Sequence, residues 1–251
     1  MDLGIEGRVA LVMGASQGIG LGVAQVLARE GVPIALASRS AERLEAAAAK
    51  IEGKTAVLPA DSSDLDQIAT LPSKVADALG AAPTILVVNT GGPPPGSALE
   101  HGSEDWEEAY RTLVLAPRAL IDGCLPGMRA EGWGRIVNVS STSVREPIPS
   151  LALSNIHRPA AEGLFNTLAR EIAAEGITLN TIATGRFATD RQRDHSGSIE
   201  AAEARAREEV PAGRLGQPEE YGDLVAFLCS DRAAYITGSV VTIDGGMTKS
   251  V

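Results

Sequence analysis

The chain has little of several residue types that mark whole classes of protein. Of its 251 residues only 2 are cysteines, and 3% are aromatic. Two scattered cysteines, outside any C-x-x-C pair, argue against a disulfide framework and predict packed thiols in a reducing compartment. The sequence also has no apolar run long enough to cross a membrane and no signal-peptide pattern near its start. We therefore expect a cytoplasmic protein without a membrane partner.

Positive charge is also scarce. The 22 Lys and Arg residues are outnumbered by 32 Asp and Glu residues, and the net charge is −10. Binding to a phosphate backbone needs a positive surface, so no nucleic-acid partner is expected. A local basic pocket for an anionic cofactor remains compatible with this balance. No metal site is predicted.

Short apolar runs alternate along the chain with longer segments of helical period. This alternation predicts βαβ units, and the absence of a linker or internal repeat predicts one domain over residues 1–251. The expected fold is a Rossmann-type α/β domain, a doubly wound parallel sheet flanked by helices. The expected strands span residues 8–13, 33–38, 55–59, 84–89, 134–140, 178–184 and 240–243. The expected helices span residues 19–30, 41–51, 65–79, 155–174 and 218–228, with a long one from Ser103 that Pro117 should bend or interrupt, and residues 186–209 form an irregular or helical excursion.

A glycine-rich turn joins the first expected strand to the first expected helix. Glycines let the backbone turn tightly and let a pyrophosphate approach main-chain N–H groups. The N-terminus of the following helix adds a partial positive charge. The turn therefore predicts a dinucleotide site, although a glycine-rich turn without a ligand is the alternative. The predicted contacts are Gly14, Ser16, Gln17, Gly18, Ile19 and Gly20.

The second expected strand ends at Ser38, and Arg39 follows it. A carboxylate at this point would hold the adenosine ribose and repel a 2′-phosphate, whereas an arginine can pair with that phosphate. Ser38 and Arg39 therefore favour NADP(H) over NAD(H). A solvated arginine at the entry of the next helix is the alternative.

The glycine spacing G-x-x-x-G-x-G resembles that of the short-chain dehydrogenase/reductase family, and the resemblance extends over essentially the whole chain. Its further motifs are Asp61-Ser62, Asn89-Thr90-Gly91-Gly92, residues 136–141, residues 214–220, Ile236-Thr237-Gly238 and Asp244-Gly245-Gly246, the last three as in 3-oxoacyl-acyl-carrier-protein reductases. The resemblance implies a seven-stranded sheet, a nicotinamide cofactor, a small-molecule substrate and a homo-oligomer, a tetramer or a dimer. It also implies cofactor contacts from Asp61, Ser62, Asn89, Gly91, Gly185 and Thr189.

The family's catalytic pattern is broken in this chain. The family uses Tyr-x-x-x-Lys on one helix, a serine thirteen residues before the tyrosine, and commonly an asparagine on the preceding helix. The resemblance puts Ser154 at the tyrosine position and Arg158 at the lysine position, retains the serine as Ser141, and puts Leu113 at the asparagine position. A serine hydroxyl is a far weaker acid than a phenol, whereas Arg158 can still hydrogen-bond the nicotinamide ribose.

Two functions follow from this break. One is an NADP(H)-dependent oxidoreductase whose atypical site contains Ser141, Ser154 and Arg158, acting on a carbonyl, imine or activated alkene. The other is a catalytically silent nucleotide-binding or assembly protein on the same scaffold. As replacement proton donors, Tyr110 is expected to lie in the core, and His157 to pack or to lie at the surface.

Three arginines cluster in the excursion after the sixth expected strand. Within an acidic protein they could receive an anionic substrate or the cofactor phosphates. Solvated loop arginines with acidic neighbours are the alternative. The three are Arg186, Arg191 and Arg193.

Overall fold

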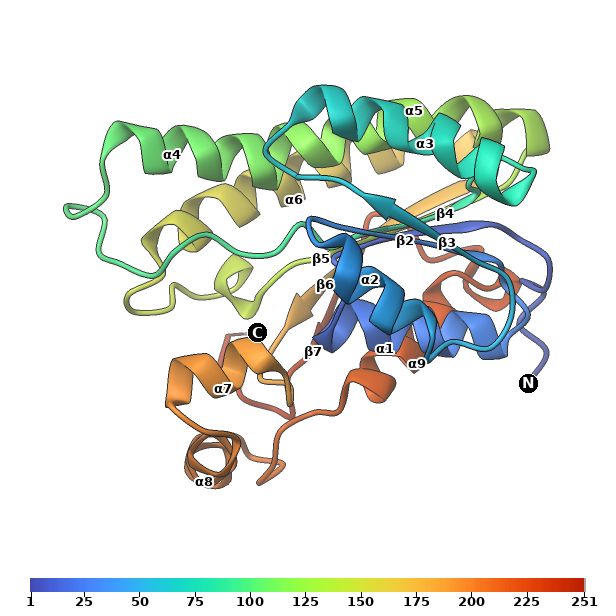
Figure 1. The fold of residues 1–251 in the computed structure, drawn as a ribbon. Helices are drawn as coiled ribbons and strands as arrows, with labels where there is room; N and C mark the ends of the chain where they lie inside the picture. The colour runs from blue at the N-terminus through green and yellow to red at the C-terminus, as the bar shows by residue number, and fades with distance from the viewer. Residues whose placement is uncertain (251) are drawn as a thin grey trace.

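A seven-stranded parallel sheet forms the middle layer of the molecule (Figure 1). The structure is a computed structural model and describes residues 1–250. The strand order is β3-β2-β1-β4-β5-β6-β7, so the direction of winding reverses beside β1. This is the doubly wound Rossmann-type fold that the alternation of strands and helices predicts. The strands are β1 Ala10–Met13, β2 Ile34–Ser38, β3 Thr55–Pro59, β4 Ile85–Val88, β5 Gly134–Val139, β6 Ile177–Thr184 and β7 Val240–Ile243.

Helices cover both faces of the sheet. In Figure 1, α3, α5 and α6 lie above it, and α1, α2 and α9 lie below it. Two large clusters of buried apolar side chains fill the two interfaces, because the central strands have both faces covered. The helices are α1 Gly18–Arg29, α2 Ala41–Ala48, α3 Leu65–Leu79, α4 Ser103–Tyr110, α5 Ala116–Glu131, α6 Ala152–Ile172, α7 Asp190–Ser196, α8 Ile199–Glu209 and α9 Pro218–Leu228.

The interruption expected near Pro117 takes the form of a π turn. Between α4 and α5, residues Arg111–Leu115 form a π-helical segment, and the Ala116 N–H donates to the carbonyl oxygen of Arg111. Proline cannot donate to the carbonyl four residues back and clashes with it, and a wider turn relieves that clash. The helical path therefore continues through Pro117 to Glu131.

The other boundaries differ from the expected ones by a few residues at element ends. The most consequential difference is at α6, which begins at Ala152 rather than at residue 155 and so includes Ser154 in its first turn. The excursion over residues 186–209 contains α7 and α8, which lie together beyond the carboxyl end of β6 (Figure 1). In residues 1–250, no helix combines the length and apolar character needed to cross a bilayer.

Candidate active site

The turn between β1 and α1 is shaped by residues that lack a side chain. Gly14 and Gly18 have φ angles of +61° and +56°, in the left-handed region that favours glycine. A Cβ on Gly20 would lie 2.2 Å from the carbonyl oxygen of Gly14, so a larger residue cannot fit there. The Gln17 side chain makes no capping hydrogen bond to the first N–H groups of α1. The backbone therefore offers a close, open approach for a diphosphate.

Two predicted residues from distant elements lie against this turn. A Cβ on Gly14 would be 2.7 Å from Nδ2 of Asn89, and one on Gly18 would be 3.2 Å from Cγ2 of Thr189. The turn, the end of β4 and the start of α7 thus meet at one edge of the sheet. Ser16 and Ile19 are partly exposed there.

Gly185, after β6, also belongs to this edge. Its N–H donates to the carbonyl oxygen of Ile243 at 3.0 Å. A Cβ on Gly185 would lie 2.5 Å from Cα of Asp244, so a side chain would separate the end of β6 from the residue that follows β7.

The end of β2 offers polar and basic groups. The Ser38 hydroxyl is buried and makes no hydrogen bond within residues 1–250, while Arg39 is exposed. Arg43, on α2, donates from Nη1 to Oε1 of Gln17 at 3.5 Å, which brings a second guanidinium next to the glycine turn. Arg43 was not predicted from the sequence, although it lies four residues after Arg39, at the start of the helix expected from residue 41. These groups fit the 2′-phosphate of NADP(H).

Asp61 and Ser62 follow β3 at the same edge. The Asp61 carboxylate accepts hydrogen bonds through Oδ1 from the Ser63 N–H and the Ser63 hydroxyl, both at 2.9 Å. These bonds fix the carboxylate, and Ser62 beside it is partly exposed.

Arg158 is the centre of a second group of residues. Its Nε donates to Oγ of Ser154 at 3.1 Å, one turn back on α6. Its Nη1 donates to the Val139 carbonyl oxygen at 3.1 Å, and its Nη2 to that of Gly91 at 2.8 Å. One guanidinium therefore joins α6 to the end of β5 and to the loop after β4.

The environment of Arg158 is electrostatically unfavourable for a cation. Desolvation lowers the pKa of Arg158 to about 10, and the nearby Arg191 guanidinium acts in the same direction. Arg158 is still a cation at neutral pH. It forms no ion pair with any residue from 1 to 250, so its charge is balanced only by the carbonyl and hydroxyl dipoles that it contacts.

Two further serines are linked to Ser154, which contacts this guanidinium. Oγ of Ser141 accepts a hydrogen bond from the Ser143 N–H at 3.1 Å and caps the short 3-10 turn Thr142–Val144. The Ser143 hydroxyl, rather than that of Ser141, pairs with the Ser154 hydroxyl at 3.2 Å. Ser143 and Ser154 are buried, whereas Ser141 is partly exposed. Ser143 was not predicted from the sequence. The spacing of thirteen residues before Ser154 identifies Ser141 alone, and it does not show that the turn after Ser141 brings the Ser143 hydroxyl to Ser154.

The other groups considered as proton donors make no hydrogen bond to these hydroxyls within residues 1–250. His157 is buried, its Nδ1 lies 2.8 Å from the Leu153 carbonyl oxygen, and its ring packs 5.6 Å from that of Trp106. Tyr110 is 47% exposed, so the expectation of a core tyrosine was wrong. Its neighbours in α4 are mostly exposed acidic residues, which turn that face of the helix to solvent. Leu113 is buried in the π turn and offers no hydrogen bond.

A buried tyrosine that the sequence reasoning did not consider lies close by. The Tyr221 hydroxyl is 2.9 Å from Oγ1 of Thr184, at the end of β6. Burial raises the pKa of the Tyr221 phenol, so it stays protonated and is a poor acid.

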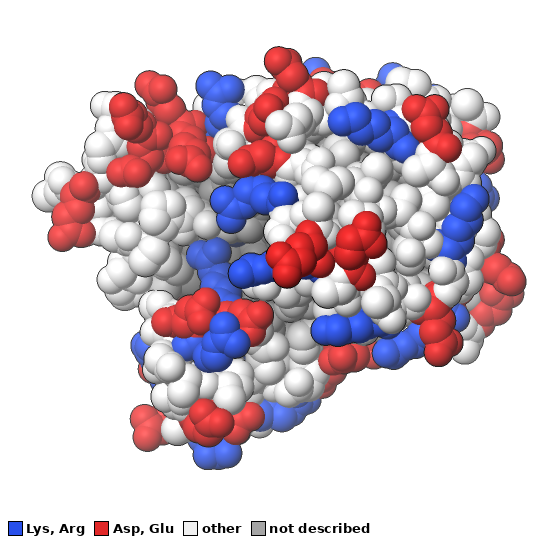
Figure 2. Space-filling model, in the orientation of Figure 1, with Lys and Arg blue, Asp and Glu red and all other residues white. Residues whose placement is uncertain are grey.

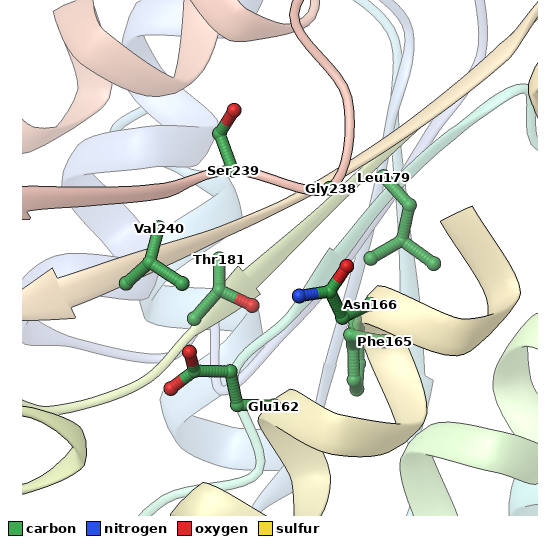
Figure 3. A pocket seen from close by; sticks show the side chains of 8 residues that line it. All are labelled: Glu162, Phe165, Asn166, Leu179, Thr181, Gly238, Ser239 and Val240. Atoms are coloured by element: carbon green, nitrogen blue, oxygen red, sulfur yellow. The ribbon is translucent and has the colours of Figure 1, made fainter. Parts of the chain in front are cut away.

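The surface near the carboxyl ends of the strands is hollowed. In Figure 2, Lys and Arg side chains border a hollow to the left of centre, over the carboxyl ends of the strands and above α7 in Figure 1. A separate small pocket lies between α6, β6 and the start of β7 (Figure 3), lined by Glu162, Phe165, Asn166, Leu179, Thr181, Gly238, Ser239 and Val240. It contains none of the predicted site residues.

Comparisons with known proteins agree with this geometry. The family model described as enoyl-(acyl carrier protein) reductase matches residues 14–248. The chain is 34% identical to the 3-oxoacyl-acyl-carrier-protein reductase FabG of Pseudomonas aeruginosa, over 99% of this chain and 100% of that protein.

Two solved structures extend the comparison. L-sorbose reductase from Gluconobacter frateurii, in complex with NADPH and L-sorbose, has a TM-score of 0.94 and 32% identity, with 100% of both chains covered. YwfH, an NADPH-dependent reductase involved in bacilysin biosynthesis, has a TM-score of 0.92 and 29% identity, over 98% of this chain and 100% of that one. The chain therefore belongs to the short-chain dehydrogenase/reductase family, with 3-oxoacyl-acyl-carrier-protein reductases among its relatives.

Proposed function

We propose that this protein is an NADP(H)-dependent oxidoreductase that acts on a carbonyl, an imine or an activated alkene. The observation that carries the proposal is the hydrogen-bonded series Arg158–Ser154–Ser143. It stands where the resemblance puts the tyrosine and lysine of the family.

The cofactor assignment is supported by the fit of the residues at the sheet edge. The glycine turn and the N-terminus of α1 would hold the diphosphate, and Ser38 and Arg39 the 2′-phosphate. Two similar solved structures are those of L-sorbose reductase in complex with NADPH and of YwfH, an NADPH-dependent reductase. Bound NADPH supplies a hydride. The remaining contacts would come from Asp61, Ser62, Asn89, Gly91, Arg158, Gly185 and Thr189.

The serines would act on the substrate oxygen or nitrogen by hydrogen bonding. Because Ser154 Oγ already accepts from Arg158, its own proton is directed toward Ser143 or toward a substrate atom. The partly exposed Ser141 adds a second hydroxyl, and together they can stabilise developing negative charge. A serine hydroxyl is a far weaker acid than a phenol, so the proton would come from solvent, relayed by water or by Ser154. This chemistry suits an imine or a conjugated alkene better than a simple ketone.

One observation favours the silent scaffold as a second candidate. The Ser154 hydroxyl is engaged on both sides, by Arg158 and by Ser143, and is buried. If both contacts persist when a ligand binds, the group does not meet a substrate.

Turnover separates the two candidates. We expect NADPH oxidation, followed by absorbance, with at least one member of a panel of ketones, imines and conjugated alkenes. Ser141→Ala should lower the rate by about 100-fold, since it removes a donor to developing charge. The matched control is Ser73→Ala, on the exposed side of α3. No turnover on the panel, with ketone reduction gained by the double variant Ser154→Tyr/Arg158→Lys, would instead establish the silent scaffold.

A homo-oligomer, tetramer or dimer, and a cytoplasmic location stay predictions. Sedimentation of the purified chain tests the first, and a fluorescent fusion observed in cells tests the second.

A further inference from the structure

The three arginines of the excursion differ in how their charge is balanced. Arg193 pairs with Asp190 at 2.7 Å and with Asp194 at 3.1 Å. Arg186 pairs with Glu209. Arg191 forms no ion pair with any carboxylate in residues 1–250. Arg191 therefore carries a charge that its neighbours do not neutralise.

Arg191 reaches from α7 to the loop after β4. Its Nη1 lies 3.3 Å from the Gly92 carbonyl oxygen, and its Nη2 lies 3.5 Å from that of Pro93. Both hydrogen bonds are long for a guanidinium, so most of its donor capacity is unused. The approach depends on Gly92, because a Cβ there would lie 2.5 Å from Nη1 of Arg191.

Arg158 holds the same loop from the other side. Its Nη2 donates to the Gly91 carbonyl oxygen at 2.8 Å, so two guanidiniums contact consecutive residues. Arg191 is close enough to act on Arg158, because its positive charge lowers the pKa of Arg158. Desolvation also lowers the pKa of Arg191, although the residue is partly open to solvent. Two unneutralised cations side by side are unfavourable until an anion joins them.

We infer that Arg191 binds a carboxylate of the substrate, and that this group lies beside the reacting carbon, on the side of the cleft where Arg158 holds the Gly91 loop. The inference rests on the proposed function and defines its substrate class as a small anionic carbonyl, imine or alkene compound. A planar guanidinium pairs with a carboxylate through two parallel hydrogen bonds, and its exposed position lets a ligand enter.

The cofactor diphosphate offers the same anionic chemistry. We assign the site to the substrate because the diphosphate already has the glycine turn and the N-terminus of α1, whereas Arg191 contacts Gly92 and Pro93. The experiment must therefore measure cofactor affinity and carboxylate affinity separately.

The test is calorimetric titration of the NADP⁺-loaded protein with unreactive matched pairs, from acetate and acetamide to 3-phenylpropionate and 3-phenylpropionamide. At least one carboxylate should bind about tenfold more tightly than its uncharged amide, the ratio expected for a charge-assisted hydrogen-bonded pair. Arg191→Gln should remove this ratio and change NADP⁺ affinity by less than about threefold. Gly92→Ala should lower the ratio without removing the charge, because it displaces the guanidinium.

The control variant is Arg193→Gln, on the same helix, whose guanidinium is already paired with Asp190 and Asp194. It should keep the carboxylate preference. The inference is overturned if no carboxylate binds more tightly than its amide. It is also overturned if Arg191→Gln weakens NADP⁺ binding as much as carboxylate binding, because Arg191 would then bind the cofactor diphosphate. An unaltered protein that binds no NADP⁺ contradicts the proposed function as well, whereas bound NADP⁺ without carboxylate preference contradicts this inference alone.

Discussion

The two ends of the cleft are built in different ways. The turn after β1 owes its shape to missing side chains, since Gly14, Gly18 and Gly20 bring backbone against backbone. The region between β5 and α6 owes its shape to side-chain hydrogen bonds from Arg158 and Ser154. A site formed by the backbone is kept as long as its glycines are kept. The groups that act on a substrate can change when only a few side chains are replaced. A chain can therefore keep the fold and the nucleotide site of the family while the side chains at the proposed catalytic positions change.

The largest effect is expected when a side chain is added to the turn after β1. Gly20→Val puts its Cβ 2.2 Å from a backbone oxygen that cannot move without disturbing the turn. We expect NADPH affinity to fall by about 100-fold, or below detection, and overpacking to lower the free energy of unfolding by about 1–3 kcal/mol. Calorimetry and urea unfolding measure the two effects.

The matched control is Gly102→Ser, since the space around Gly102 is open and the residue is the N-cap of α4. It should leave NADPH affinity unchanged and alter stability by only a few tenths of a kcal/mol, roughly. NADPH affinity in Gly20→Val equal to that of the unaltered chain would show that the turn is not the diphosphate site.

A smaller effect is expected at the side-chain end. Arg158→Met leaves the carbonyl oxygens of Val139 and Gly91 and the Ser154 hydroxyl without their donor. The free energy of unfolding should fall by about 2–3 kcal/mol, and NADPH affinity by about tenfold. Arg158→Lys keeps the charge but lacks the fork of donors, so its losses should be smaller. Equal losses in both variants would mean that the planar fork, rather than the charge, is what the site needs.

The fold was largely predictable from the sequence, because apolar runs and helical periods report burial directly. The strands Thr55–Pro59 and Val240–Ile243 and the helices Leu65–Leu79 and Pro218–Leu228 have the expected bounds. The start of α6 was misplaced, since Ala152 and Leu153 carry no capping signal and Leu151, which precedes them, makes no side-chain cap. The π turn before Pro117 depends on how the neighbouring helices pack around the proline, and the local sequence does not predict that packing.

The candidate site was predictable from the sequence only where the shape of the backbone forms it. The glycine spacing located the turn, and the resemblance to the family supplied Asn89 and Thr189, which lie against it. The pairing of Ser143 with Ser154, and the contrast between Arg191 and Arg193, depend on side-chain directions set by tertiary packing. Sequence spacing identifies candidate residues, and the side-chain contacts show which of them lie together.

The affinities of the unaltered protein and of Arg39→Ala for NADPH and NADH, measured by calorimetry, decide whether the site prefers NADP(H). The unaltered protein should bind NADPH about tenfold more tightly than NADH, because Arg39 would pair with the 2′-phosphate. In Arg39→Ala the two affinities should agree within about twofold. Equal affinities in the unaltered protein would contradict the NADP(H) preference, and no binding of either cofactor would contradict the claim that the backbone site is intact.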